Sequence, residues 1–231
     1  MRKPKRHGVG LADLLTTTAL CALLATSAAA RTSKPALATK GHFVQRTVRP
    51  SGAVTLYDQT ARDSGISIVS QNFESSFDAY DCEAADDFVV PDGVKWRVTE
   101  IDILGTTFNG SGVADSENIF IYKNKRGKPG RIVAEYDSIV GAETWGTFVV
   151  PLTTPAKLKP GHYWLSFQAN ESFNQQGEWG WEASEDVVGL PSLWRNPGGG
   201  FDIGCTEWTT QTECIPDGQG DQMFALKGHA R

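Results

Sequence analysis

Residues 88–104 read Phe-Val-Val-Pro-Asp-Gly-Val-Lys-Trp-Arg-Val-Thr-Glu-Ile-Asp-Ile-Leu, with apolar runs on either side of a Pro-Asp-Gly turn signal. In the second run Trp96 and Val98 share one strand phase, whereas Ile101 and Ile103 share the other. Successive side chains of a strand point to opposite faces, so both pairs reach one core only if the strand holds an extra residue. The segment therefore predicts two strands and a β-bulge at Thr99–Glu100.

Similar short apolar segments recur along the chain, separated by turns that contain glycine or proline. They cover residues 65–73, 118–122, 132–136, 147–152, 162–169, 178–183 and 222–226. The turn clusters are Asn109–Gly112, Lys128–Gly130, Lys159–Gly161 and Asn196–Gly200. Short strands separated by regular turn signals are typical of sandwiches. We predict an all-β fold, one antiparallel, jelly-roll-like β-sandwich over residues 57–231.

The composition is that of a globular protein and limits the class of partner. Of the 231 residues, 40% are hydrophobic and 21% charged, and the formal net charge is −5. General nucleic-acid binders usually present a basic surface. The charge balance therefore argues against a nucleic acid as partner.

The first thirty residues have the plan of a cleaved secretory signal peptide. Basic residues at positions 2, 3, 5 and 6 precede a mostly apolar stretch, and Ala28 and Ala30 fit the small-residue cleavage rule. An uncleaved anchor is the alternative, but the apolar stretch is shorter than the about 20 residues of a spanning helix. We expect a secreted protein, extracellular or periplasmic, without a membrane span in the mature chain.

The mature chain changes composition near residue 57. Without residues 1–30 it has 18 basic and 26 acidic residues, a net charge of −8. Residues 31–57 hold five basic residues and no acidic one. This break predicts a flexible basic lead over residues 31–56, with one strand near Phe43–Val48, before the sandwich begins.

Three cysteines remain after removal of the leader: Cys82, Cys205 and Cys214. Export favours disulfide formation, and Cys205 and Cys214 bracket only eight residues. We predict a Cys205–Cys214 disulfide with Cys82 as a free thiol, and a bond from Cys82 to either of the other two is the alternative. Without a Cys-x-x-Cys pair the spacing does not indicate zinc.

Two acidic strand segments are the candidates for catalysis. Glu100-Ile-Asp102 resembles part of the Glu-x-Asp-x-x-Glu motif of retaining jelly-roll glucanases, which need two carboxylates about 5 Å apart. Leu104 and Gly105 stand where the acid/base should be. Glu178 and Glu182 are the other strand carboxylates. Nucleophile-elbow, zincin and Walker motifs are absent from the sequence, which therefore favours a non-catalytic protein.

Tryptophans supply the candidate ligand-binding groups. Trp194 lies in a Trp-Arg-Asn-Pro-Gly-Gly-Gly loop and Trp208 follows close behind, and we expect both indoles to be exposed. Indoles stack on sugar rings, and the Arg195 guanidinium and Asn196 amide suit hydroxyl groups. Loop aromatics that merely plug the end of a sandwich are the alternative. Trp179 and Trp181 share one face of a predicted strand, and core packing is the alternative for these two indoles. The ligand-binding candidates are Trp194, Arg195, Asn196, Trp208, Trp179 and Trp181.

Acidic residues gather around Cys82: Asp78, Asp81, Glu83, Asp86 and Asp87. Closely spaced oxygen ligands are the type that Ca²⁺ takes, so structural calcium is the one cofactor that we consider. The candidate metal ligands are Asp78, Asp81, Asp86 and Asp87. A solvated acidic turn is the alternative.

Basic residues are concentrated in another predicted turn: Lys123, Lys125, Arg126, Lys128 and Arg131. Binding of an anionic glycan or a nucleic acid is one interpretation of such a cluster. No aromatic residues interleave with the charges, as they do in single-strand binding proteins. The sequence therefore favours a solvated turn.

A set of segments resembles a family of secreted bacterial β-sandwich proteins of uncharacterised function. They are residues 84–91 (Ala-Ala-Asp-Asp-Phe-Val-Val-Pro), 96–102, 108–112 (Phe-Asn-Gly-Ser-Gly), 161–169, 178–181 (Glu-Trp-Gly-Trp), 194–200 (Trp-Arg-Asn-Pro-Gly-Gly-Gly) and 221–226. The resemblance covers roughly residues 57–228. It implies an exported β-sandwich, in some members appended to larger surface proteins or hydrolases, and carries over no catalytic residue.

Two functions are consistent with these patterns. The first is a secreted non-catalytic binding or surface-interaction module, with an extracellular polysaccharide or a cell-surface component as partner. The alternative is a secreted glycoside hydrolase that uses the strand carboxylates Glu100, Asp102, Glu178 or Glu182.

Overall fold

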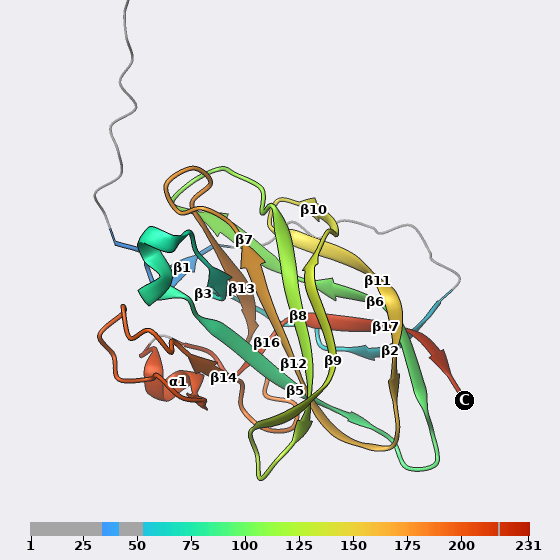
Figure 1. The fold of residues 1–231 in the computed structure, drawn as a ribbon. Coiled ribbons are helices and arrows are strands. Elements are labelled where there is room, and N and C mark those ends of the chain that lie inside the picture. The colour runs from blue at the N-terminus through green and yellow to red at the C-terminus, as the bar shows by residue number, and fades with distance from the viewer. Residues whose placement is uncertain (1–33, 42–52, 217) are drawn as a thin grey trace, which may run out of the picture. The chain divides into compact units, whose positions relative to one another are not determined.

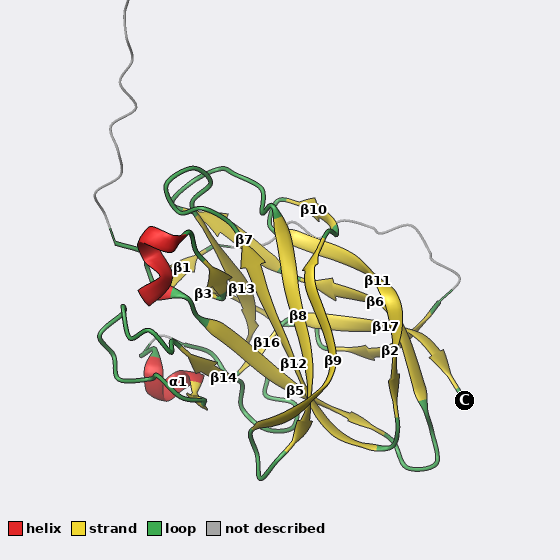
Figure 2. Cartoon of the chain, in the orientation of Figure 1, coloured by secondary structure: helices red, strands yellow, loops and turns green. Residues whose placement is uncertain are grey.

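A computed structural model of the protein describes residues 34–41, 53–216 and 218–231 (Figure 1). Strands dominate these residues, and their helices are the 3₁₀ turn η1 (Ser75–Tyr80) and the single turn α1 (Gln211–Cys214) (Figure 2). The signal peptide predicted for residues 1–30 and the strand predicted near Phe43–Val48 lie outside the described residues.

The strands form three sheets that pack together, with antiparallel pairing throughout except between β4 and β12. The first sheet contains β1 (Ala38–Lys40), β3 (Asp63–Val69), β13 (Glu178–Ser184), β16 (Asp221–Gln222) and β7 (Gly105–Phe108). The second contains β10 (Ala142–Thr144), β11 (Thr147–Leu158), β6 (Trp96–Ile103), β17 (Phe224–Ala230) and β2 (Val54–Asp58). The third contains β15 (Thr209–Thr210), β14 (Leu193–Arg195), β5 (Glu83–Val90), β12 (Gly161–Asn170), β8 (Ser116–Asn124) and β9 (Pro129–Ile139), with β4 (Gln71–Asn72) beside β12. The predicted antiparallel β-sandwich is confirmed.

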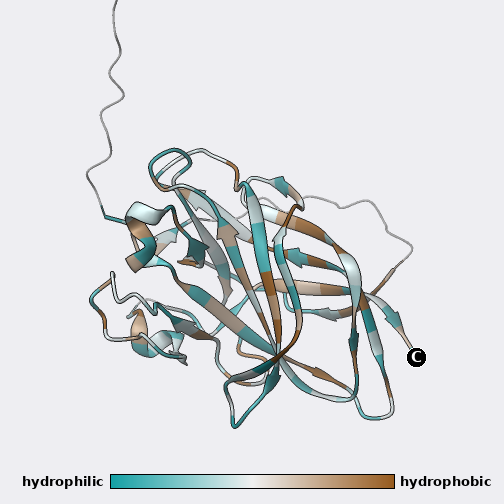
Figure 3. Ribbon diagram, viewed as in Figure 1, coloured by the Kyte–Doolittle hydropathy of each residue, from teal (hydrophilic) through white to brown (hydrophobic). Residues whose placement is uncertain are grey.

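The three sheets meet at a junction of aromatic rings. Phe148 of β11, Phe167 of β12 and Trp179 of β13 are each fully buried and come from different sheets. The ring centroids are 5.1 Å apart for Phe148 and Phe167, and 4.8 Å apart for Phe167 and Trp179. Hydrophobic and hydrophilic residues alternate along many of the strands (Figure 3). The third sheet also carries a second, smaller apolar cluster, formed by Ala85, Tyr122, Trp164, Leu193 and Trp208.

The bulge predicted in β6 is present. Against β17, Glu100 pairs with Lys227 and Val98 pairs with Gly228, which leaves Thr99 as the extra residue. As a result Trp96 and Val98 lie in the same core as Ile101 and Ile103, all of them buried.

Two segments of the predicted lead are strands rather than flexible chain. β1 pairs with β3, from Ala38 opposite Ile68 to Lys40 opposite Ile66. β2 pairs with β17 at the edge of the second sheet. The sandwich therefore includes strands from before residue 57. The change of composition at that point marks a change of charge and not the start of the fold.

The cysteines pair as predicted. Cys205 and Cys214 form a disulfide with a Cα–Cα distance of 6.0 Å, and Cys82 is a buried free thiol. Cys82 lies just before β5, and its Sγ contacts the carbonyl of Val69 at 3.5 Å. Burial raises the pKa of the Cys82 thiol well above its ordinary value.

Deletion of Thr99 should unfold the sandwich, because the loss of the bulge forces Trp96 and Val98 onto the face opposite Ile101. We expect a loss of at least about 4 kcal/mol in the free energy of unfolding, measured by urea titration. Thr99→Ala keeps the bulge and should cost less than about 1 kcal/mol. A deletion variant as stable as Thr99→Ala would contradict this role of the bulge.

Candidate functional site

The two indoles expected to be exposed are buried. Trp194 is 0% exposed and Trp208 is 8% exposed. Trp194 belongs to β14, where it pairs with Ala84 of β5, and its Nε1 donates a hydrogen bond to the carbonyl of Val69 at 2.8 Å. The expectation of exposure is wrong for Trp194 because its segment is a sheet strand and not an open loop. It is wrong for Trp208 because the ring packs against Arg195 and Tyr122.

The polar neighbours of Trp194 are bound internally. The Arg195 guanidinium lies 4.4 Å from the centroid of the Trp208 ring and donates from Nη2 to Glu83 Oε2 at 2.5 Å. The Asn196 amide donates to the carbonyls of Ala79 and Asp81, each at 2.8 Å. Arg195 and Asn196 therefore hold the 194–201 turn in place, and the hydrogen bonds expected for a ligand are used within the fold.

Trp179 and Trp181 have the core role that the sequence left as an alternative. Both are 0% exposed. Trp179 Nε1 donates to the carbonyl of Gly146 at 2.7 Å, and Trp181 Nε1 donates to the carbonyl of Met223 at 2.9 Å. Neither indole offers a face to a sugar ring in this packing.

The four carboxylates considered for hydrolysis are also held by neighbours. Glu100 and Asp102 both form ion pairs with Lys227, at 2.9 and 2.5 Å. Glu178 accepts hydrogen bonds from the Ala36 amide and the Asn109 side chain, each at 2.6 Å. Glu182, 0% exposed, accepts a hydrogen bond from Ser67 Oγ at 2.6 Å. These contacts join strands to one another and leave both acidic segments with structural roles.

The acidic residues around Cys82 do not form one cluster. Asp78 is exposed in η1, whereas Asp81 accepts a hydrogen bond from the Phe73 amide at 2.7 Å. Asp86 accepts from the side chain of Gln59 at 2.6 Å, and Asp87 contacts His162. Within the described ranges, no three His, Cys, Asp or Glu residues form a group that could hold a metal ion. Of the residues offered as calcium ligands, Asp81, Asp86 and Asp87 have separate structural partners.

Glu83, Asp86 and Asp87 are also not part of a solvated turn. All three are buried in β5. Asp86 interacts electrostatically with Asp221, which is itself fully buried. The pKa of Asp86 is raised well above its ordinary value, mainly by burial and in second place by repulsion from Asp221.

Buried carboxyl groups with raised pKa values occur elsewhere in the fold. Burial, reinforced by a hydrogen bond with Asp63, raises the pKa of Glu182 to about 8. Burial also raises the pKa of Asp221 to about 7, and burial together with repulsion from Glu143 raises that of Glu171 to about 8. In the unfolded chain such groups titrate near pH 4. The folded protein therefore binds more protons than the unfolded chain between about pH 4 and pH 8.

The free energy of unfolding should fall as the pH rises from about 5 to 8. A folded-state pKa above the unfolded value stabilises the fold at low pH, and the contribution is lost as the pH rises through the folded-state pKa. Glu182→Gln and Asp221→Asn should each reduce this slope. Urea unfolding in steps of pH measures it, and a stability that is constant or rises over this range would contradict the expectation.

One tryptophan is exposed, and it is not among the predicted ligand-binding residues. Trp145 is 81% exposed at the tip of the β10–β11 hairpin. Thr144 pairs with Thr147, so Trp145 and Gly146 form a two-residue loop, with φ of +54° and +84°. Positive φ at both positions is the signature of a type I′ turn. A Cβ on Gly146 would lie 2.6 Å from the carbonyl oxygen of Gly105, which excludes any other residue.

The sequence holds a signal for this hairpin. Glu-Thr-Trp-Gly-Thr, residues 143–147, places an X-Gly pair directly before an apolar strand, the pattern of a two-residue hairpin loop. Asn or Gly usually occupies the first loop position of a type I′ turn. A tryptophan at that position is the unusual feature.

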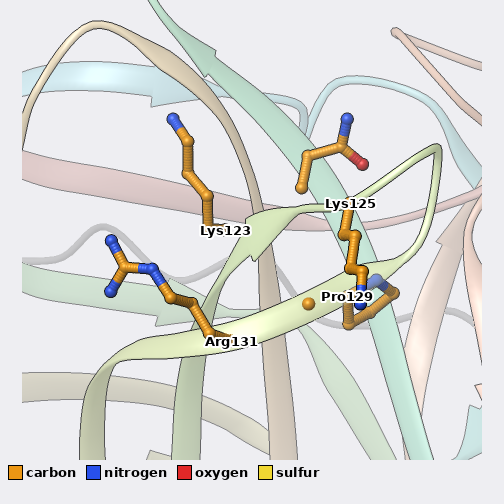
Figure 4. Close-up of a pocket in the computed structure, with 6 residues that line it drawn as sticks. Lys123, Lys125, Pro129 and Arg131 are labelled. Atoms are coloured by element: carbon orange, nitrogen blue, oxygen red, sulfur yellow. The ribbon is translucent and has the colours of Figure 1, made fainter.

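The β8–β9 hairpin has the same design with a cation in place of the indole. Arg126 and Gly127 form its two-residue loop, with φ of +57° and +80°, between Lys125 and Lys128, whose backbones bond to each other. This hairpin borders a hollow of about 540 Å³. Figure 4 shows the side chains that line it. Its lining residues are Lys123, Asn124, Lys125, Pro129, Gly130 and Arg131.

No family model matches this chain, and the searches of curated proteins and of solved structures return no match either. In the part of the chain that the structure describes, no helix is long and apolar enough to cross a membrane. The resemblance to secreted bacterial sandwich proteins stays a prediction.

Proposed function

We propose that this protein is a secreted, non-catalytic binding module that contacts a sugar ring of an extracellular polysaccharide through Trp145. The observation that carries the proposal is the contrast among the tryptophans. Six of the seven are at most 8% exposed, whereas Trp145 is 81% exposed. Export is supported by the signal-peptide pattern of residues 1–30 and by the Cys205–Cys214 disulfide.

The placement of Trp145 works against local stability, which points to a role outside the fold. A non-glycine residue in the left-handed region costs about 1–2 kcal/mol. An indole in solvent also returns none of the stabilisation that burial of its apolar surface would give. Meanwhile the Trp179 Nε1 bond to the Gly146 carbonyl fixes the turn beneath the ring. An exposed aromatic ring on a fixed backbone is suited to stacking, because only the freedom of the Trp145 side chain is lost when a ligand binds.

The absence of catalysis is part of the proposal. Glu100 and Asp102 share the ammonium group of Lys227, and Glu178 and Glu182 are fully buried under strand contacts. A retaining glycosidase needs two carboxylates that face the same substrate bond. The contacts of these four groups favour binding over hydrolysis.

Trp145→Asn tests the proposal without harming the turn. Asn is favoured at this position of a type I′ turn, so the free energy of unfolding should stay the same or rise by up to about 1 kcal/mol. Binding to the polysaccharides identified on a glycan array should weaken at least tenfold. Trp145→Phe keeps an aromatic face and should retain most of the affinity.

The matched control is Val187→Ala, which removes another exposed apolar side chain and should leave binding unchanged. Full affinity in Trp145→Asn would overturn the proposed role of the indole. Turnover of chromogenic glycosides by the wild-type protein would overturn the non-catalytic assignment.

A further inference from the structure

The β8–β9 hairpin concentrates positive charge on an acidic protein. Residues 123–131 contain five basic side chains and no acidic one, whereas the mature chain has a net charge of −8. Four of the five are exposed, and Lys123 is half-buried. None of the five forms an ion pair with a carboxylate in the described part of the chain. The cations are therefore not neutralised within the fold.

A bulge in this hairpin places two of the basic residues opposite each other on neighbouring strands. Asn124 pairs with Pro129 and Tyr122 pairs with Ile132, so Lys123 stands opposite both Gly130 and Arg131. In Figure 4, the side chains of Lys123 and Arg131 start from neighbouring strands of the hairpin. A Cβ on Gly130 would lie 2.7 Å from the Lys123 carbonyl oxygen, so the close approach of the strands depends on this glycine. Bulges of this kind redirect side chains.

The hairpin is held rigidly on the sandwich. Asn124 Oδ1 accepts hydrogen bonds from the Gly127 amide at 3.1 Å and from Trp164 Nε1 at 3.0 Å. Lys128 Nζ donates to the carbonyl of Trp208 at 2.6 Å. Lys123 Nζ lies 4.2 Å from the centroid of the Tyr163 ring, which restricts its side chain. Lys123 and Lys128 are thereby ordered and lose little conformational entropy when an anion binds.

We infer that this hollow binds the anionic groups of an acidic polysaccharide, with Lys123 and Arg131 as the primary contacts. The Arg131 guanidinium can bind a carboxylate or sulfate in a bidentate manner, and Lys123 supplies a second charge in the lining of the same hollow. The open hollow of about 540 Å³ admits a sugar residue that carries such a group. No aromatic side chain lines the hollow, so bases have no stacking surface there.

The inference rests on the proposed function for the class of polymer but uses a separate site. The basic loop follows the Asn124 end of β8, whereas β10 and Trp145 follow Ile139 of β9, which pairs with Glu117 near the other end of β8. The nine residues of β8 span about 30 Å at the usual rise of a strand. Substitutions at the two sites should therefore act independently.

The test measures binding of the purified full-length mature chain to polygalacturonate, dextran sulfate and neutral dextran. The wild-type protein should bind at least one of the two acidic polymers more tightly than neutral dextran, with an affinity that falls as salt rises. Lys123→Gln combined with Arg131→Gln should weaken that binding at least tenfold. Lys34→Gln combined with Lys40→Gln removes the same charge from two exposed lysines elsewhere and should change the affinity less than twofold.

Equal affinity of the two double variants would overturn the inference, as would failure of the wild-type protein to bind either acidic polymer. Tighter binding to single-stranded DNA or to vesicles with anionic lipid would overturn the assignment to polysaccharide. Trp145→Asn separates the two proposals. If it keeps its affinity for the acidic polymer while Lys123→Gln with Arg131→Gln loses it, the basic hollow binds independently of Trp145. The proposed role of Trp145 fails if Trp145→Asn also keeps its affinity for the polysaccharides identified on the glycan array.

Discussion

The hydrogen bond from Trp179 Nε1 to the Gly146 carbonyl connects the centre of the fold to its surface. Trp179 lies at the junction of the three sheets, with its ring 5.5 Å from that of Phe148. Phe148 follows the β10–β11 turn by only two residues, so one indole packs the core and fixes the backbone of the turn. The backbone that carries the exposed Trp145 is therefore tied directly to the core of the fold.

Strand positions and the β6 bulge could be predicted because they depend on local alternation. Trp96, Val98, Ile101 and Ile103 specify their face within eight residues. The burial of Trp194 could not be predicted in this way, since it depends on pairing with Ala84, more than a hundred residues earlier. The Gly-rich sequence after Trp194 favours a loop, and only the long-range pairing shows that it closes a sheet edge.

The candidate sites illustrate the same limit. Composition located the charges correctly but not their partners: Asp86 and Asp87 look like a surface cluster in sequence, yet both are buried in β5. Trp145 and Arg126 each precede glycine in a two-residue loop, a signal that is local and readable. In both hairpins the first loop residue is one that a type I′ turn does not favour. The fold therefore does not require Trp145 or Arg126 at these positions.

The burial of Cys82 has a consequence for redox behaviour. Thiol–disulfide exchange requires a thiolate, and a buried thiol with a raised pKa seldom ionises. Burial also keeps the sulfur atoms of other thiols and disulfides away from Cys82. Once folded, the protein can carry an unpaired cysteine through an oxidising environment without scrambling its Cys205–Cys214 bond. The same shielding prevents two copies of the chain from crosslinking through Cys82.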